Sequence, residues 1–298
     1  MILVRIPNWI GDAVISRGFL RALKENVDSE IFVIGKEYLK DIFYDYNFFG
    51  FKSYKDYFKI LKHFKNIGFE KIFILPFSFS SAFFPFLAGI KFRVGIDSDN
   101  RGFILTHKVS SFYIKREHLL KSFLRLIGLE ENFNNFIPNF DKIKVDEKND
   151  LVIIAPQASY GKTKEWLFFK DLAKFLLKEG FEVLIVGKRK EESYPKGVVD
   201  LREKTNLSDI LKIISESKYV FSNDSGIAHI ASALGKKVFV FFGSTLPLWT
   251  KPLGENVFIF YKKISCSPCF KRVCMFGTYE CLRKINLEEV VKVFNILR

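Results

Sequence analysis

The chain has 298 residues, enough for two domains of ordinary size that each bury a hydrophobic core. Nearly half of the residues are hydrophobic and 35 are phenylalanine, which excludes a disordered chain. The formal charge of +14 indicates a negatively charged partner, and charge alone does not choose between nucleic acid, an anionic membrane surface and a phosphorylated substrate.

The first segment predicts a strand, a glycine-containing turn and a helix. Residues 2–6 are mostly β-branched, and the turn over 8–13 leads into a helix that we expect to run to about Leu23. Gly11 permits a tight backbone at the helix start, and Asp12 falls in the first turn, where the helix dipole favours a carboxylate. Asp12 is therefore either a helix-terminal acid or a functional one. No basic segment or cleavage site precedes this strand, so we expect a cytoplasmic protein.

The next helical pattern combines aromatic and basic residues. A strand over 31–34 precedes it, and between residues 51 and 70 the aromatic residues keep helical spacing while lysines occupy another face. The lysine face is either a solvated surface or a surface that contacts an anionic membrane.

Residues 72–90 carry no charge and reach the length at which a transmembrane helix is considered. Pro76, Pro85 and Gly89 argue against a span. We expect a buried strand over 71–75, a loop and a short core helix, and no transmembrane segment.

The first half ends with a strand over 92–96 and a helix that begins at 116–118 and ends near Gly128. His118 is either a base that faces a ligand or a histidine on the helix surface. The polar residues 141–150 have no regular periodicity, which is typical of a linker. We therefore place the domain boundary after residue 148, giving domains 1–148 and 149–298.

The second half repeats the alternation of strand, loop and helix. A polar loop over 156–166 carries hydroxyls, a glycine and lysines, so it either holds a diphosphate or is simply solvated. The remaining predicted elements are strands over 151–155, 181–187, 198–201, 219–221 and 237–243 and helices over 168–178, 205–217 and 230–235. Apolar runs of this kind suit parallel sheets that are covered on both faces, so two doubly wound α/β domains are expected.

The polar cluster Asn223–His229 lies between the strand over 219–221 and an alanine-rich helix. Ser225 can cap that helix, and Gly226 lets a ligand approach its first backbone N–H groups. This is a nucleotide-binding geometry, although the same pattern also occurs as a plain α/β connection.

Four stretches together resemble a known family. They are residues 5–14 (Arg-Ile-Pro-Asn-Trp-Ile-Gly-Asp-Ala-Val), residues 156–166, residues 223–229 with 242–245, and residues 266–272 (Cys-Ser-Pro-Cys-Phe-Lys-Arg). In order and spacing they resemble glycosyltransferase family 9, the ADP-heptose:LPS heptosyltransferases, and within it the heptosyltransferase II branch. The resemblance implies a GT-B architecture, with two Rossmann-like domains facing a central cleft. The N-terminal domain would bind the acceptor and the C-terminal domain the nucleotide sugar.

The resemblance also implies the reaction, an inverting transfer of L-glycero-D-manno-heptose from ADP-heptose to the inner-core heptose of lipopolysaccharide. Asp12 matches the family's general base, and a carboxylate can take the proton of an attacking hydroxyl. Asn8 and Gly11 fall on the acceptor side. The implied donor-binding residues are Ser159, Tyr160, Lys164, Thr205, Asn206, Asp224, Ser225, Gly226 and His229. His229 either binds the diphosphate or braces the loop, and Glu191 and Glu192 both remain open as contacts of the ribose.

No cofactor is expected for catalysis, because a lysine and a helix N-terminus can stabilise the leaving ADP without a metal. The Asp97-Ser98-Asp99 sequence is interpreted as a turn. Four cysteines, Cys266, Cys269, Cys274 and Cys281, leave a structural zinc, reduced thiols and disulfides as alternatives.

The chain departs from the family in the loop after residue 75, where Phe77-Ser78-Phe79-Ser80-Ser81 lacks an arginine that is common there, so one acceptor-side cation is in doubt. The expected partners are ADP-heptose and a Kdo- and heptose-bearing lipid A acceptor, with the protein in the cytoplasm or peripheral at the inner face of the inner membrane. The alternatives are a related GT-B transferase, adding the first or a later heptose or using another nucleotide sugar, and a basic protein that binds nucleic acid. No nucleic-acid motif supports the latter, so a nucleic-acid partner is not expected.

Overall fold

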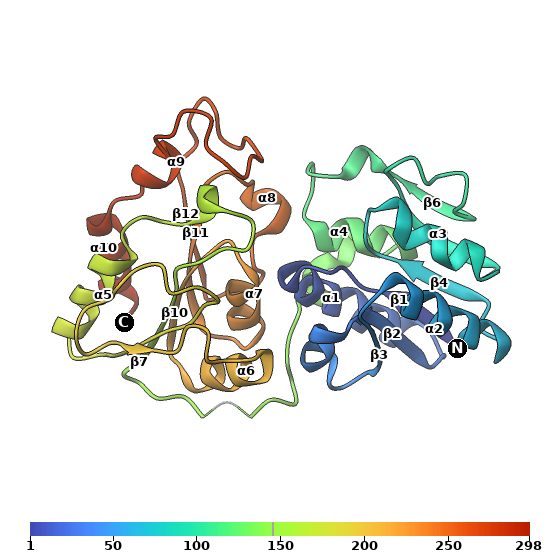
Figure 1. The fold of residues 1–298 in the computed structure, drawn as a ribbon, viewed down its shortest axis with the longest axis horizontal. Helices are drawn as coiled ribbons and strands as arrows, with labels where there is room; N and C mark the ends of the chain where they lie inside the picture. Colours follow the sequence, from blue (N-terminus) through green and yellow to red (C-terminus); the bar gives the residue numbers. More distant parts are fainter. Residues whose placement is uncertain (145) are drawn as a thin grey trace. The chain divides into compact units, whose positions relative to one another are not determined.

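The computed structural model describes residues 1–144 and 146–298, which form two compact units, Met1–Pro138 and Asn139–Arg298 (Figure 1). The residue just before the segment predicted as a linker, 141–150, and part of that segment itself hydrogen-bond to the second unit. The Phe140 N–H donates to the Ala233 carbonyl at 3.1 Å, and the Lys148 N–H donates to the Glu216 carbonyl at 2.8 Å. The predicted linker also includes residue 145, which lies outside the described residues.

The first unit is built on a six-stranded parallel sheet with the strand order β3-β2-β1-β4-β5-β6. Its strands are β1 (Ile2–Arg5), β2 (Ile31–Lys36), β3 (Asn47–Phe51), β4 (Lys71–Ile74), β5 (Phe92–Asp97) and β6 (His107–Ser110). Its helices are α1 (Ile10–Asn26), α2 (Tyr54–Asn66), α3 (Phe79–Leu87) and α4 (Leu119–Leu124), with 3-10 helices at Glu37–Phe43, Ser111–Tyr113, Arg125–Ile127 and Glu130–Phe136. In the centre, Val4 of β1 is in register with Val33 of β2 and Phe73 of β4.

The second unit repeats this topology with the order β12-β11-β10-β7-β8-β9. Its strands are β7 (Leu151–Ala155), β8 (Glu182–Ile185), β9 (Val199–Asp200), β10 (Tyr219–Asn223), β11 (Lys237–Phe242) and β12 (Val257–Tyr261). Its helices are α5 (Phe169–Lys178), α6 (Leu207–Glu216), α7 (Gly226–Ala233), α8 (Pro247–Thr250), α9 (Glu280–Arg283) and α10 (Leu287–Leu297), with a 3-10 helix at Lys162–Lys164. The prediction of two Rossmann-like doubly wound units is thereby confirmed.

The strand order reverses between β1 and β4 in the first unit and between β7 and β10 in the second. Ligands of open parallel sheets bind where the order reverses, at the carboxyl ends of the strands. The loops that matter in the second unit are therefore those that follow β7 and β10.

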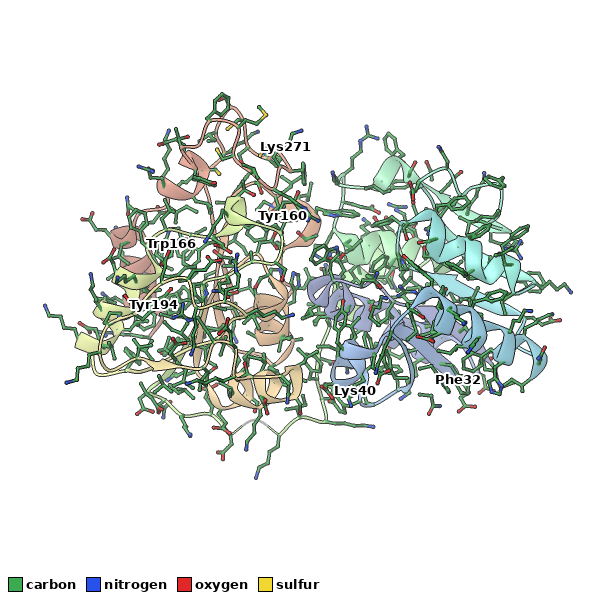
Figure 2. All side chains as sticks on the ribbon, viewed as in Figure 1. Phe32, Lys40, Tyr160, Trp166, Tyr194 and Lys271 are labelled. Carbon is green, nitrogen blue, oxygen red and sulfur yellow. The ribbon has the colours of Figure 1, made fainter. Side chains whose placement is uncertain are left out.

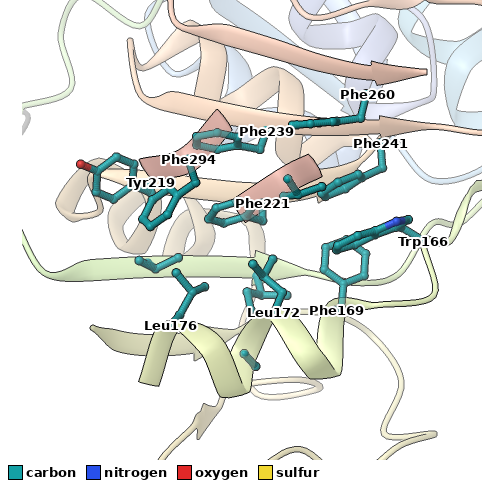
Figure 3. Close-up of a cluster of buried hydrophobic side chains, with 14 of the residues drawn as sticks. Trp166, Phe169, Leu172, Leu176, Tyr219, Phe221, Phe239, Phe241, Phe260 and Phe294 are labelled. Carbon is teal, nitrogen blue, oxygen red and sulfur yellow. The ribbon is translucent and has the colours of Figure 1, made fainter. Parts of the chain in front are cut away.

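An aromatic core fixes the end of the loop after β7 (Figure 3). The Trp166 ring stacks on Phe241 of β11 with centroids 4.1 Å apart, and its indole N–H donates to the Ile285 carbonyl at 2.7 Å. Trp166 is 3% exposed, so both the burial of its ring and the hydrogen bond of its indole N–H fix the position of the side chain. The loop therefore has a rigid end only two residues after Lys164.

The uncharged segment 72–90 folds as β4, a loop and α3, as expected. In the described part of the chain, no helix has the length and apolar content needed to cross a bilayer. The helix differs from the predicted core helix in one respect, because Phe86 and Leu87 are 46% and 49% exposed.

His118 does not lie on the helix surface. It precedes α4 as the N-cap residue, is 6% exposed, and its Nδ1 accepts a hydrogen bond from the Leu120 N–H at 3.2 Å. The interpretation as a helix-surface histidine was wrong, because the ring turns inward to cap the helix.

Candidate functional site

A buried asparagine joins the two loops at the reversal point of the second sheet. The Asn223 side chain accepts a hydrogen bond from the Trp166 N–H at 2.9 Å and donates to the Pro156 carbonyl at 2.8 Å. Asn223 is fully buried, so both bonds are made away from water. The loops after β7 and β10 are thereby held side by side at the carboxyl ends of their strands.

Lys164 and Asp224, both predicted donor-binding residues, meet at this junction. The Lys164 ammonium donates to the Asp224 carboxylate and, at 3.3 Å, to the Asp224 carbonyl. The same carboxylate oxygen accepts a hydrogen bond from the Thr245 hydroxyl at 2.6 Å. The side chains of Lys164 and Asp224 are 12% and 3% exposed, so an ion pair with little solvent lies beside the start of α7.

The N-terminus of α7 lies directly after Asp224. Ser225 is the N-cap residue, as predicted, but within the described residues no side-chain hydrogen bond caps the helix. The Ser225 hydroxyl instead lies 3.0 Å from the Ser222 hydroxyl. The prediction of a side-chain cap was therefore wrong, and the helix start keeps backbone N–H groups available to an anion.

The segment that carries the cysteines supports the loop after β7 from another side. The Tyr160 hydroxyl donates to the Phe270 carbonyl and the Thr163 hydroxyl to the Lys271 carbonyl, both at 2.6 Å. Figure 2 shows Tyr160 and Lys271 at the same end of the second unit. Partial burial raises the pKa of Tyr160, which keeps its hydroxyl as a donor at neutral pH.

Gly161 and Ser244 also bring the loop after β7 into close contact with the cysteine segment. Gly161 has φ +138°, and a Cβ there would lie 2.7 Å from the Arg272 carbonyl oxygen, so only glycine fits. The Ser244 N–H donates to the Thr163 carbonyl at 3.1 Å, and the Ser244 carbonyl accepts from the Phe270 N–H at 2.8 Å. Sequence analysis did not identify Thr163 as a supporting residue, since nothing in its neighbourhood points to a partner more than a hundred positions away.

The other predicted donor-binding residues are not part of the Lys164–Asp224 ion pair. Ser159 is exposed, and His229 is 5% exposed within α7. Asn206 forms a capping box at the start of α6 with Asp209, because its side chain accepts from the Asp209 N–H at 3.0 Å. Thr205 precedes this cap and is half-buried. The contacts of Thr205 and Asn206 with a base or ribose stay a prediction.

Glu191 and Glu192 line a cavity of about 190 Å³ next to the loop after β7, together with Lys162, Tyr194 and Arg202. Glu191 accepts a hydrogen bond from the Lys162 ammonium at 2.6 Å, which lowers the pKa of Glu191 below its usual value. The Glu192 carbonyl accepts from Arg202 at 2.7 Å. Both glutamates therefore remain close to the loop, and neither is singled out as the ribose contact.

The predicted acceptor-side residues lie in the first unit, around the start of α1. Asp12 is in the first turn of the helix and is half-buried, as is Gly11. The Asn8 side chain accepts a hydrogen bond from Arg5 at 2.6 Å. Arg5 is 3% exposed at the end of β1, with its guanidinium 4.8 Å from the Phe51 ring centroid, and burial lowers its pKa. The turn that carries Asn8 and Asp12 thus starts from a buried cation.

Within residues 1–144 and 146–298, no group of three or more histidine, cysteine or acidic side chains is arranged to hold a metal ion. Asp99 accepts from the Phe79 N–H at 2.6 Å, and Asp97, the last residue of β5, pairs with Lys108 of β6 at 3.1 Å. Only part of the predicted turn is therefore a turn.

The four cysteines are unbridged and partly buried, and they line one small cavity of about 40 Å³. Backbone N–H groups, that of Tyr279 above all, lower the pKa of Cys274, whereas burial raises the pKa of Cys281. The structure therefore favours thiols over disulfides in this segment.

A family model described as glycosyltransferase family 9 (heptosyltransferase) matches residues 57–280. Lipooligosaccharide heptosyltransferase 2 of Haemophilus ducreyi is 26% identical over 306 residues, which cover 87% of each chain. The enzyme of the same name from Campylobacter jejuni is 24% identical, over 98% of this chain and 97% of its own.

Solved structures share the fold. The structure of E. coli ADP-heptose LPS heptosyltransferase II superposes with a TM-score of 0.74 at 20% identity, covering 97% of this chain and 99% of that one. A family 9 glycosyltransferase from Veillonella parvula reaches 0.80 at 15% identity, over 99% and 96% of the two chains. On the match of the family model to most of its length, this chain belongs to glycosyltransferase family 9, the heptosyltransferases.

Proposed function

We propose that this glycosyltransferase moves L-glycero-D-manno-heptose from ADP-heptose to the inner-core heptose of lipopolysaccharide, with inversion at the anomeric carbon. The relatives that match 87% and 98% of this chain are both named lipooligosaccharide heptosyltransferase 2, which supports this choice. The observation that carries it is the ion pair of Lys164 and Asp224 at the start of α7, in the unit that would bind the nucleotide sugar.

The donor would lie with its diphosphate at the N-terminus of α7. Gly226 presents backbone N–H groups there, and Lys164 adds a positive charge that offsets the charge developing on the ADP leaving group. The Asp224 carboxylate, oriented by Thr245, would accept hydrogen bonds from hydroxyls of the sugar. Ser159 and Tyr160 would contact the diphosphate, and His229 would support the helix start from within.

Asp12 would act as the general base in the first unit. The acceptor hydroxyl must lose its proton as its oxygen attacks C1 of the heptose, and the carboxylate of Asp12 accepts that proton. Asn8 and Gly11, in the same turn, would orient the acceptor. The bond between C1 and the diphosphate oxygen breaks as the new glycosidic bond forms, so ADP leaves with the electron pair.

The acceptor would be the Kdo- and heptose-bearing lipid A of the inner membrane surface, which the net charge of +14 favours because that acceptor is anionic. The reaction as proposed uses no cofactor, and a cytoplasmic location follows from its substrates.

A structural zinc at Cys266, Cys269, Cys274 and Cys281 also stays a prediction. Metal analysis of protein purified without chelator tests it, and a zinc content near zero would end it.

The test of the proposed reaction is mass spectrometry of two acceptors after incubation with ADP-heptose, heptosyl-Kdo2-lipid A and the same acceptor without heptose. We expect a gain of one heptose only on the first acceptor. The Asp12→Asn variant should show no gain while it still binds ADP, and retained turnover would remove Asp12 as the base. A gain on the heptose-free acceptor would assign addition of the first heptose, and no gain on either would point to another nucleotide sugar or acceptor.

A further inference from the structure

Helix α3 fully buries only small residues and leaves two large ones, Phe86 and Leu87, exposed. Ser81, Ala82 and Pro85 are buried, and Ala88 directly after the helix is 7% exposed. An ordinary surface helix buries its large apolar residues and exposes polar ones. In α3, Phe79, Phe83 and Phe84 pack only partly against the core, and the helix contains no charged residue.

The exposed side of α3 forms a continuous apolar stripe, which consists of Phe79, Phe83, Phe86 and Leu87. These positions have the spacing i, i+4, i+7 and i+8, so they lie along one side of the helix. Phe79 and Phe83 are half-buried and stack with centroids 5.4 Å apart. The stripe continues onto the loop after β5, where the Phe103 ring lies 6.2 Å from Phe79 and the residue is 80% exposed.

Helix α2 runs beside α3 and supplies positive charge. The Tyr54 and Ser80 hydroxyls are 3.2 Å apart near the starts of the two helices, and the rings of Phe58 and Phe84 lie 6.3 Å apart further along (Figure 1). The Lys62 ammonium lies 5.1 Å from the Phe58 ring centroid.

Near the other end of α3, the Arg93 guanidinium lies 5.4 Å from the Phe86 ring centroid. Among residues 1–144 and 146–298, no salt bridge involves the cations of α2 and of the segment before β5, which are Lys55, Lys59, Lys62, Lys65, Lys91 and Arg93.

We infer that the α3 stripe and Phe103 dock on an anionic phospholipid bilayer, with the surrounding lysines against the lipid headgroups. Exposed apolar surface of this extent marks an interaction site, and unpaired cations around it match a negatively charged partner. An apolar stripe flanked by lysines is the pattern of a helix that lies in the plane of a membrane interface.

This inference deepens the proposed function, because an acceptor anchored in a membrane by lipid A must be reached from the bilayer surface. The acceptor itself is not needed for the docking. Binding to vesicles that contain neither acceptor nor donor therefore tests the surface without testing the reaction.

The experiment is flotation of the full chain with vesicles of phosphatidylcholine and phosphatidylglycerol, with vesicles of phosphatidylcholine alone as comparison. We expect binding to the anionic vesicles that weakens with added salt. The variant Phe86→Ser/Leu87→Ser should bind at least about tenfold more weakly, since it removes two side chains from the apolar phase. The variant Lys62→Gln/Lys65→Gln should bind about 25-fold more weakly, at about fivefold for each cation.

Matched control substitutions lie in the second unit at Leu248 and Ile296, which are 53% and 73% exposed. Leu248→Ser/Ile296→Ser should bind vesicles like the wild type. Equal binding of the α3 variants and the control would overturn the inference. So would sedimentation showing that wild-type chains pair through this surface and that Phe86→Ser/Leu87→Ser separates them, because a second copy would then be the occupant.

Transfer to a soluble, lipid-free acceptor oligosaccharide separates the two proposals. Phe86→Ser/Leu87→Ser should retain that transfer while losing vesicle binding. A chain that binds vesicles through α3 but transfers no heptose would leave the docking surface standing and refute the proposed reaction.

Discussion

Replacing Lys164 with methionine separates its structural role from its proposed role in donor binding. Methionine keeps most of the side-chain length and removes the charge, so Asp224 loses its cation. The Asp224 side chain is only 3% exposed, so its carboxylate would remain with few compensating contacts.

Two effects of different size follow. Removing one partner of a buried ion pair costs about 3–5 kcal/mol, and here we expect about 2–3 kcal/mol because Thr245 still donates to the carboxylate. For a unit of this size, that corresponds to a fall in melting temperature of about 5–10 °C. If Lys164 also contacts the diphosphate, loss of a charged hydrogen bond costs about 2 kcal/mol of binding, which weakens ADP affinity roughly 30-fold.

The assay is a thermal melt and a calorimetric titration with ADP on the same preparations. Lys174→Met is the matched control, since Lys174 is 58% exposed and pairs with Asp171 on the surface of α5. We expect the control to match the wild type in both measurements. If Lys164→Met melts earlier but binds ADP as the wild type does, Lys164 is a structural residue and its proposed contact with the donor is wrong.

Three further predictions concern the second unit. Tyr160→Phe removes one of the hydrogen bonds that tie the loop after β7 to the cysteine segment. The KM for donor should rise several-fold with kcat nearly unchanged. An equal fall in kcat would argue against a positioning role. A hydrogen bond from the neighbouring arginine lowers the pKa of Asp200 to about 2, so Asp200→Asn should destabilise the protein by about 1 kcal/mol at neutral pH. Because this pKa lies below that of the unfolded chain, the difference should shrink as pH falls from about 4 to about 2, and a difference that persists in acid melts would contradict it. Iodoacetamide should modify Cys274 before Cys281 near pH 7, since their pKa values are lowered and raised respectively; peptide mass spectrometry with the reverse order would refute this.

The central strands could be predicted because burial on both faces leaves long apolar runs. β1, β7, β10 and β11 all lie in such runs, and the predicted ranges agree with the structure to within two residues at each end. The strand β3, Asn47–Phe51, was missed, because it begins with a polar residue and contains a glycine. The strand β12 was also missed, although Val257–Tyr261 has strong β-propensity and the Gly254 turn precedes it.

The sequence predicts which charged residues belong to the site. It does not predict which residues those charged side chains contact. Lys164 and Asp224 were both identified, but only the fold brings together two loops that are 60 positions apart in sequence. Asn223, which holds the loops, looks in sequence like any polar residue in a turn. The outward face of α3 could not be foreseen for a related reason, since an apolar segment predicts burial and does not say what covers it.

The contacts between the loop after β7 and the cysteine segment have a consequence for how this region tolerates change. Tyr160 and Thr163 donate to the backbone carbonyls of Phe270 and Lys271, while the Arg272 guanidinium lies 5.4 Å from the Tyr160 ring centroid. A carbonyl is present whatever residue occupies the position, so substitutions at 271 should be well tolerated, whereas the positive φ of 52° at Phe270 disfavours β-branched residues there. Chain length is different, because deletion of one residue would move every carbonyl out of reach. Related sequences should therefore vary in residue type at 271 while keeping the number of residues across 270–272 constant.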